Sequence, residues 1–148
     1  LVAQGKFAAN NIPDSLKKNM YAVVREQHSS FTIIDRAHSK FYYHSAITIL
    51  KSKGNSYAEI SVDYDKLTKI KSLKATVYDA LGSVVRKVKA SEFLDQSAIS
   101  GFSLFEDSRE KVLDLRQASY PYTIEYEYEI EMDFLYWIPA FRLYTDDE

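Results

Sequence analysis

The sequence contains no cysteine, only four glycines and three prolines, and no excess of basic residues. Without cysteine the chain can form no disulfide, no thiol nucleophile and no thiolate metal site. Its 19 Lys and Arg stand against 21 Asp and Glu, so nothing favours binding to a phosphate backbone and nucleic acid is not an expected partner. No run of about 18 apolar residues occurs, so no membrane span is predicted.

The residues that are present favour a single globular, β-rich domain. The 148 residues are 46% hydrophobic and 27% charged, which is typical of a folded chain with a sizeable core. Twelve tyrosines and eight phenylalanines favour strands over helices. We expect residues 1–11 to be a leader, residues 12–141 a single β-sandwich domain, and residues 142–148 a tail or the start of a linker to a missing domain.

The segment IPDSLKKNM at 12–20 predicts a short helix. Asp14 or Ser15 can accept hydrogen bonds from the free N–H groups of its first turn. Leu16 and Met20 lie one turn apart on one face. Because so short a helix is unstable alone, it must dock on a larger body.

The rest of the chain is rich in strand patterns. Gly54-Asn55 indicates a hairpin, and Asp79 with Gly82 indicates a second one closed by a bulge. These signals and the alternation of apolar and polar residues predict an all-β, antiparallel sandwich with a short N-terminal helix. The expected strands lie at 21–26, 30–35, 40–53, 56–64, in a hairpin over 73–90, and at 111–115, 120–132 and 134–141.

The stretch YPYTIEYEYEIEM at 120–132 alternates apolar residues with glutamates. This pattern is typical of a strand with its apolar side in the core and its glutamates in water. Basic residues near the neighbouring strands can balance the row. A calcium site and a basic protein partner are the alternatives, although a flat row cannot wrap a cation with six to eight oxygens. The balancing residues proposed are Lys66, Lys69, Lys71, Lys74, Arg86, Lys87 and Lys89.

Residues 91–110 follow neither the strand nor the helix period. Such a stretch is either a crossing connection with a strand or helical turn of its own, or a functional loop. Arg109 can grip a carboxylate at two points. Asp95, Asp107 and Arg109 are therefore candidate ligand- or partner-binding residues, unless Arg109 pairs with Asp95 or Asp107 to pin the connection to the sandwich.

Tyr136 and Trp137 form a further candidate site near the C-terminus. Two aromatic side chains there can stack on a sugar. The apolar segment FLYWIPAF is alternatively core, or a seam for a following domain.

Catalytic and cofactor motifs are missing from the sequence. It has no HExxH motif, no G-x-S-x-G elbow and no glycine-rich phosphate loop. Its three histidines show no metal-binding spacing. We therefore predict no cofactor, no metal and no enzymatic activity for this chain.

An ordered set of motifs resembles a known family. IPDSLKKNMYAVVRE, ITILKSKGNSYAEISVDYDK, IKSLKATVYDALGSV, SLFEDSREKVLDL and YPYTIEYEYEI resemble the domain of unknown function that precedes the transglutaminase-like domain in exported proteins of Bacteroides-type bacteria. The resemblance implies an immunoglobulin-like β-sandwich. It also implies a longer, periplasmic or cell-surface parent protein of a Gram-negative bacterium. The family's catalytic Cys, His and Asp belong to the later domain, so none is transferred to this chain.

Two functions are expected on this basis. The first is a non-catalytic module that positions or regulates a downstream transglutaminase-like or protease-like domain, which would then be its partner. The alternative is a glycan- or peptide-binding module at the cell surface, using residues 91–110 and exposed tyrosines. An enzyme in its own right would require a cleft with convergent polar groups.

Overall fold

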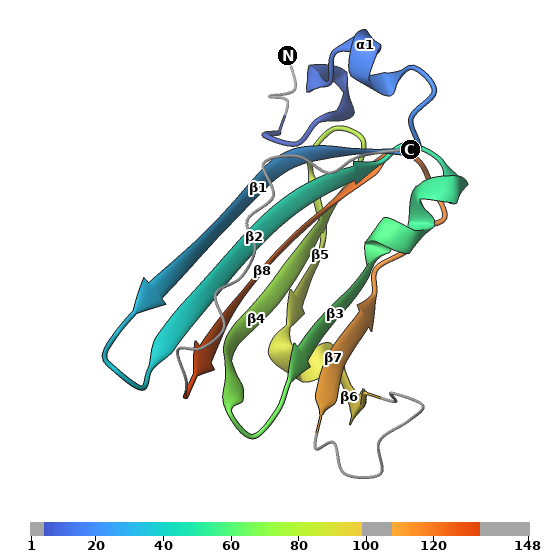
Figure 1. Cartoon of the computed structure of the whole chain (residues 1–148). Coiled ribbons are helices and arrows are strands. Elements are labelled where there is room, and N and C mark those ends of the chain that lie inside the picture. The colour runs from blue at the N-terminus through green and yellow to red at the C-terminus, as the bar shows by residue number, and fades with distance from the viewer. Residues whose placement is uncertain (1–4, 99–107, 134–148) are drawn as a thin grey trace.

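The computed structural model describes residues 5–98 and 108–133, and eight strands in these ranges form two antiparallel sheets (Figure 1). The larger sheet has the order β1-β2-β8-β4-β5, and the smaller sheet has the order β3-β7-β6. This confirms the predicted antiparallel sandwich with a short helix. The strands are β1 Ala22–Ile33, β2 Ser39–Ile49, β3 Glu59–Tyr64, β4 Thr68–Tyr78, β5 Val84–Lys89, β6 Leu94–Ser97, β7 Arg109–Asp114 and β8 Tyr122–Met132.

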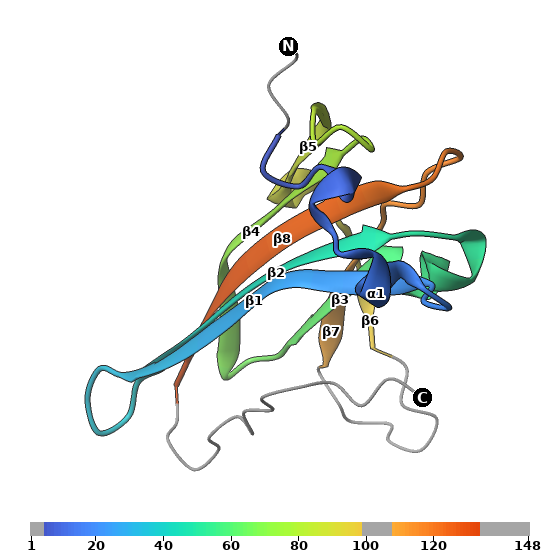
Figure 2. The same cartoon turned by 90° about the horizontal axis from the view of Figure 1, so that it is seen from above.

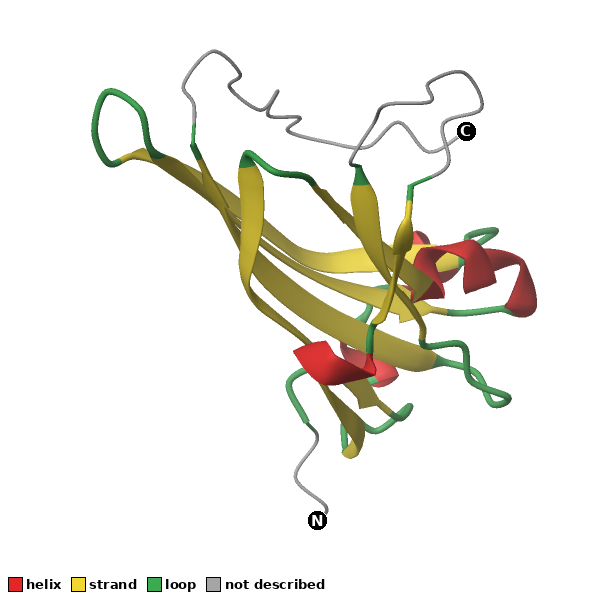
Figure 3. Cartoon of the chain, turned by 90° about the horizontal axis from the view of Figure 1, so that it is seen from below, coloured by secondary structure: helices red, strands yellow, loops and turns green. Residues whose placement is uncertain are grey.

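One hydrophobic core joins the two sheets. Strand β4 buries its alternate residues Leu73, Ala75 and Val77, as the period of two requires. Ile60 and Leu113 enter the same cluster from the smaller sheet. Helical turns lie at the ends of the strands, while the strands form the body of the described molecule (Figure 3).

The hairpin between β4 and β5 forms as predicted. The side chain of Asp79 accepts hydrogen bonds from the backbone N–H groups of Leu81 and Ser83, at 2.9 and 2.8 Å. Gly82 has φ of 82°, a left-handed conformation that favours glycine. The ladder between the strands shifts at Val77 and Tyr78, which is the expected bulge.

The hairpin predicted at Gly54-Asn55 is wrong. Residues Ser52–Ala58 form the 3-10 helix η2, through which the chain passes from β2 in the larger sheet to β3 in the smaller one. A Cβ atom on Gly54 would lie 2.5 Å from the carbonyl oxygen of Tyr21. Glycine is therefore needed here for close backbone approach, which sequence alone cannot distinguish from a turn.

The N-terminal segment is packed where the structure describes it. Phe7 and Ala8 are 2% and 1% exposed, and Gly5 and Ala9 donate backbone hydrogen bonds to the β4–β5 turn. The segment, with the short helix η1 Ala9–Asn11, lies over the end of the larger sheet where β8 begins (Figure 2). This end of the chain therefore packs on the sandwich, although the expected bounds of a leader over 1–11 stay a prediction.

Helix α1 spans Asp14–Lys17 and differs from its predicted form in two ways. Pro13 is the N-cap, and no side chain caps the first turn, because Asp14 already lies inside the helix. Leu16 remains 52% exposed, so the predicted apolar face is only partly covered. No helix in the described ranges is long and apolar enough to cross a membrane.

Two further predictions changed in detail. The strands expected at 21–26 and 30–35 are one strand, β1, with a bulge between Val24 and Glu26. The irregular stretch 91–110 contains strand β6 and the end of the 3-10 helix η3, Ala90–Glu92, so a crossing connection with structure of its own is the correct alternative in its described part. The strand expected at 134–141 lies outside the described residues.

Candidate functional site

The glutamates of β8 lie in the middle of the larger sheet, between β2 and β4. Glu125 accepts a hydrogen bond from the Tyr78 hydroxyl at 2.5 Å, and its other oxygen lies 3.0 Å from His44 Nε2. Glu127 accepts from Lys74 Nζ at 2.8 Å and from the Tyr42 hydroxyl at 3.1 Å. The hydrogen bond from Lys74 lowers the pKa of Glu127. Burial, together with the bond to Glu125, raises the pKa of Tyr78 to about 12.

The remaining two glutamates of the row are also paired. Lys40 lies 3.4 Å from Glu129, and Lys71 lies 3.2 Å from Glu131. The predicted balance is confirmed for Lys71 and Lys74, whereas the partners on β2 had not been anticipated. In the described ranges no group of three or more acidic or histidine side chains is arranged to hold a metal ion. The four glutamates of the row are therefore paired with side chains of the neighbouring strands β2 and β4.

Two of the predicted candidate residues lie together on the smaller sheet. Asp95 accepts hydrogen bonds from Lys111 Nζ and the Tyr64 hydroxyl, both at 2.8 Å, and from Arg109 Nε at 2.9 Å. These bonds, led by that from Lys111, hold the pKa of Asp95 at about 2.

The Asp95–Arg109 pair also lies at the base of the long connection between β6 and β7. The backbone N–H of Ala98 donates to the carbonyl of Ser108 there, at 3.0 Å. This pairing corresponds to the pinning role considered above. Asp107, Tyr136 and Trp137 lie outside the described residues.

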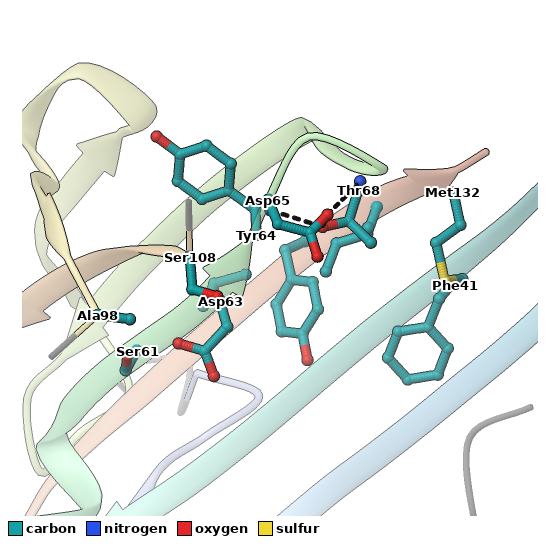
Figure 4. A pocket seen from close by; sticks show the side chains of 12 residues that line it. Phe41, Ser61, Asp63, Tyr64, Asp65, Thr68, Ala98, Ser108 and Met132 are labelled. Carbon is teal, nitrogen blue, oxygen red and sulfur yellow. Dashed lines mark hydrogen bonds between the residues drawn. The ribbon is translucent and has the colours of Figure 1, made fainter. Parts of the chain in front are cut away.

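A groove of about 570 Å³ opens beside this cluster, between the two sheets (Figure 4). Five consecutive residues, Ser61–Asp65, line it from β3 and the turn that follows. Phe41 of β2 and Tyr128 of β8 line it from the larger sheet. In Figure 4, Asp63 and Phe41 lie on different sides of the view. The volume falls within the usual range for ligand sites, about 300–1,000 Å³.

Strand β3, which lines the groove, has a free edge. That strand pairs only with β7, so its other edge has no strand neighbour in the described sheet. Successive side chains of a strand point to opposite faces. The lining also includes Ala98 and Ser108, beside the ends of β6 and β7, so the hollow reaches across the end of the smaller sheet.

The hydrogen-bond register shows which backbone groups face this edge. Leu115 N–H donates to the Ala58 carbonyl, so these two residues form a hydrogen-bonded pair of the antiparallel ladder. Such pairs alternate along the strands. Ile60 and Val62 therefore point their backbone groups to β7, whereas Ser61 and Asp63 point theirs away from it.

Asp63 is the carboxylate of the groove that has no ionic partner. It is exposed and makes no hydrogen bond or ion pair with any described residue. Asp65, in contrast, accepts bonds from Leu67 N–H and from Thr68 in its own turn. Burial, followed by the nearby Tyr43 and the charge of Asp63, raises the pKa of Tyr128 to about 12.

Aromatic side chains support the wall opposite Asp63. Tyr128 stacks on Tyr43 with ring centroids 5.4 Å apart, and Phe41 lies 6.2 Å from Tyr128. Sequence reasoning missed Phe41, Asp63 and Tyr128 because none belongs to a chemical motif. The sequence feature that could have indicated the site was Asp63, an acidic residue on the polar side of a short strand.

The chain belongs to the DUF3857 family, a domain of unknown function that has a solved structure. The family model matches residues 35–142. No curated protein matches the chain.

A crystal structure from Parabacteroides distasonis has the same fold, and that protein carries the description "putative protease". The TM-score is 0.62 at 15% sequence identity, over 79% of this chain. The match spans 24% of the Parabacteroides chain, so this chain corresponds to about a quarter of that protein.

Proposed function

We propose that this chain is a non-catalytic module of a larger exported protein, in which it positions or regulates a transglutaminase-like or protease-like catalytic domain. One observation supports this most directly: the same fold forms about a quarter of a longer chain described as a "putative protease". The parent protein would be periplasmic or on the cell surface of a Gram-negative bacterium. The catalytic domain would follow this module.

The sandwich suits such a role because most of its polar side chains serve its own structure. The glutamate row of β8 is paired within the sheet, and Asp95 is paired within the smaller sheet. A body stabilised in this way can hold a neighbour in a fixed orientation. The groove along β3 offers unpaired groups for contact.

The test is to produce this chain and the region that follows it in its gene, separately and as one protein. The proposal predicts that the separate parts bind and that the catalytic part changes in activity or stability when joined to the module. A partner present at about 100 times its dissociation constant stabilises the fold by about 2.7 kcal/mol. A gene without a catalytic region, or two parts that neither bind nor influence each other, would contradict the proposal.

A peptide- or glycan-binding module is the second candidate function. The groove favours it, because its lining includes aromatic side chains and the Asp63 carboxylate, which has no ionic partner among the described residues. Binding of a peptide or glycan by the isolated chain would support this function without any catalytic partner. The two candidates are compatible, since a module can hold the substrate of its catalytic neighbour.

A further inference from the structure

We propose that the groove binds an extended, basic segment of polypeptide as an added strand on the free edge of β3. This inference rests on the second candidate function and specifies its ligand and its site. The ligand would lie between β3 and the wall formed by β2 and β8. Its backbone would pair with Ser61 and Asp63, and a lysine or arginine side chain would reach the Asp63 carboxylate.

The backbone of β3 supplies the first argument. Ser61 and Asp63 direct their N–H and C=O groups away from β7, toward the free edge of β3, and both residues line the groove. An exposed strand edge is a template for another strand, and peptide recognition by strand addition uses such edges. In that mode the backbone bonds provide affinity and the flanking pockets select alternate side chains.

Charge supplies the second argument. Asp63 lies directly opposite Glu110 in the ladder between β3 and β7. Glu110 accepts hydrogen bonds from Ser61 and Gln96, whereas Asp63 has no hydrogen bond or ion pair among the described residues. A cationic side chain of the ligand would pair with Asp63.

The opposite wall fits the same ligand. Tyr128 and Phe41 present aromatic surface in the groove, and Ile130 continues it along β8. The methylene stem of a lysine packs on apolar surface while its ammonium reaches a carboxylate. Aromatic faces also attract a cation. A glycan would use the aromatic wall but would leave the strand edge unpaired, so the edge favours a peptide.

The decisive experiment measures binding of a fluorescent peptide that alternates lysine with threonine, about six residues long, the usual length of a strand. The matched probe replaces every lysine with glutamate. We expect binding of the lysine peptide that weakens with salt, and at least tenfold weaker binding of the glutamate peptide. Equal binding of both would overturn the inference.

Two matched pairs of variants locate the site. Ser61→Pro removes an outward N–H, and an edge strand tolerates proline at such a position. Ser61→Ala keeps the N–H and removes only the hydroxyl. We expect about tenfold weaker binding for Ser61→Pro than for Ser61→Ala, because the proline removes one backbone hydrogen bond to the ligand and its ring disturbs the neighbouring ones.

The second pair tests the charge. Asp63→Asn should weaken binding about threefold to fivefold, in line with an exposed ion pair. Glu59→Gln, on the same strand but not in the groove lining, should leave it unchanged. This pair keeps the test decisive if Ser61→Pro does not fold.

The remaining outcomes each overturn a defined part of the account. Peptide binding that ignores both pairs would leave a peptide-binding function standing and refute the site. Binding of a glycan but of no peptide would refute the inference and leave the broader second candidate. Concentration-dependent dimerisation lost only in Ser61→Pro would assign the edge to a second copy of the chain. None of these results bears on the catalytic-module proposal.

Discussion

Strand β8 and strand β3 both carry acidic side chains, but their surroundings differ. Each of the four glutamates of β8 contacts a cation, a histidine or a tyrosine on a neighbouring strand. Asp63 of β3 has no such partner in the part of the chain that the structure describes, and its backbone groups point to the edge of β3 that has no described strand neighbour. The conspicuous row is therefore structural, and the inconspicuous aspartate marks the candidate site. Unpaired groups indicate a site better than the number of charges does.

The largest effect is expected on the core side of β8. Ile124 is fully buried, so Ile124→Ala should lower the free energy of unfolding by about 2–5 kcal/mol, through lost burial and the cavity left behind. Urea denaturation followed by circular dichroism would measure this. A loss below 1 kcal/mol would show that the two sheets do not share the tight core described above.

The glutamate row should show a smaller and graded effect. Glu125→Ala leaves His44 and Tyr78 without their acceptor in a partly buried place, and should cost about 1–3 kcal/mol. Glu131→Ala breaks the ion pair with Lys71, which is more exposed to solvent. It should lower the free energy of unfolding by less than about 1 kcal/mol. The same denaturation experiment compares them. Equal losses of stability in the two variants would mean that burial does not determine how much each glutamate contributes.

Acid should reveal the paired carboxylate of the smaller sheet. The folded pKa of Asp95, about 2, lies below its unfolded value near 3.9. Its stabilisation is therefore complete above about pH 4 and is lost as the pH falls through about 2. Asp95→Asn should flatten the decline of the melting temperature over that window. An unchanged decline would show that the bonds to Lys111, Tyr64 and Arg109 do not form in solution.

The smallest effect on stability is expected at Asp63. Asp63→Asn removes no hydrogen bond or ion pair to a described residue, so the free energy of unfolding should change by less than about 0.5 kcal/mol. The same substitution should lower the pKa of Tyr128, because the negative charge of Asp63 raises it. Ultraviolet titration of the tyrosines would detect that shift. A marked loss of stability would give Asp63 a structural role and contradict the comparison with β8.

Local patterns predicted much of the fold. The period of two identified the buried sides of β3, β4 and β8, and Asp79 with Gly82 identified the hairpin. The prediction failed where a residue type serves two purposes. Gly54 accommodates a close backbone contact rather than a turn, and that contact comes from Tyr21, which is distant in the sequence.

The candidate site was much less predictable. Asp95 and Arg109 were proposed from a break in periodicity, and the structure places them together. The groove instead depends on which strand ends the smaller sheet and on which residues of β2 and β8 lie across from it. Strand order is a property of tertiary packing. The pairing of Glu125 with His44 was missed for the same reason.

Amide hydrogen exchange along β3, measured with and without the lysine peptide, tests the central claim most directly. The register predicts slow exchange at Ile60 and Val62 and fast exchange at Ser61 and Asp63 in the free protein. The peptide should slow exchange at Ser61 and Asp63 and leave the β8 amides unchanged. Unchanged exchange at both residues with the peptide bound, or protection along β8 instead, would contradict the account.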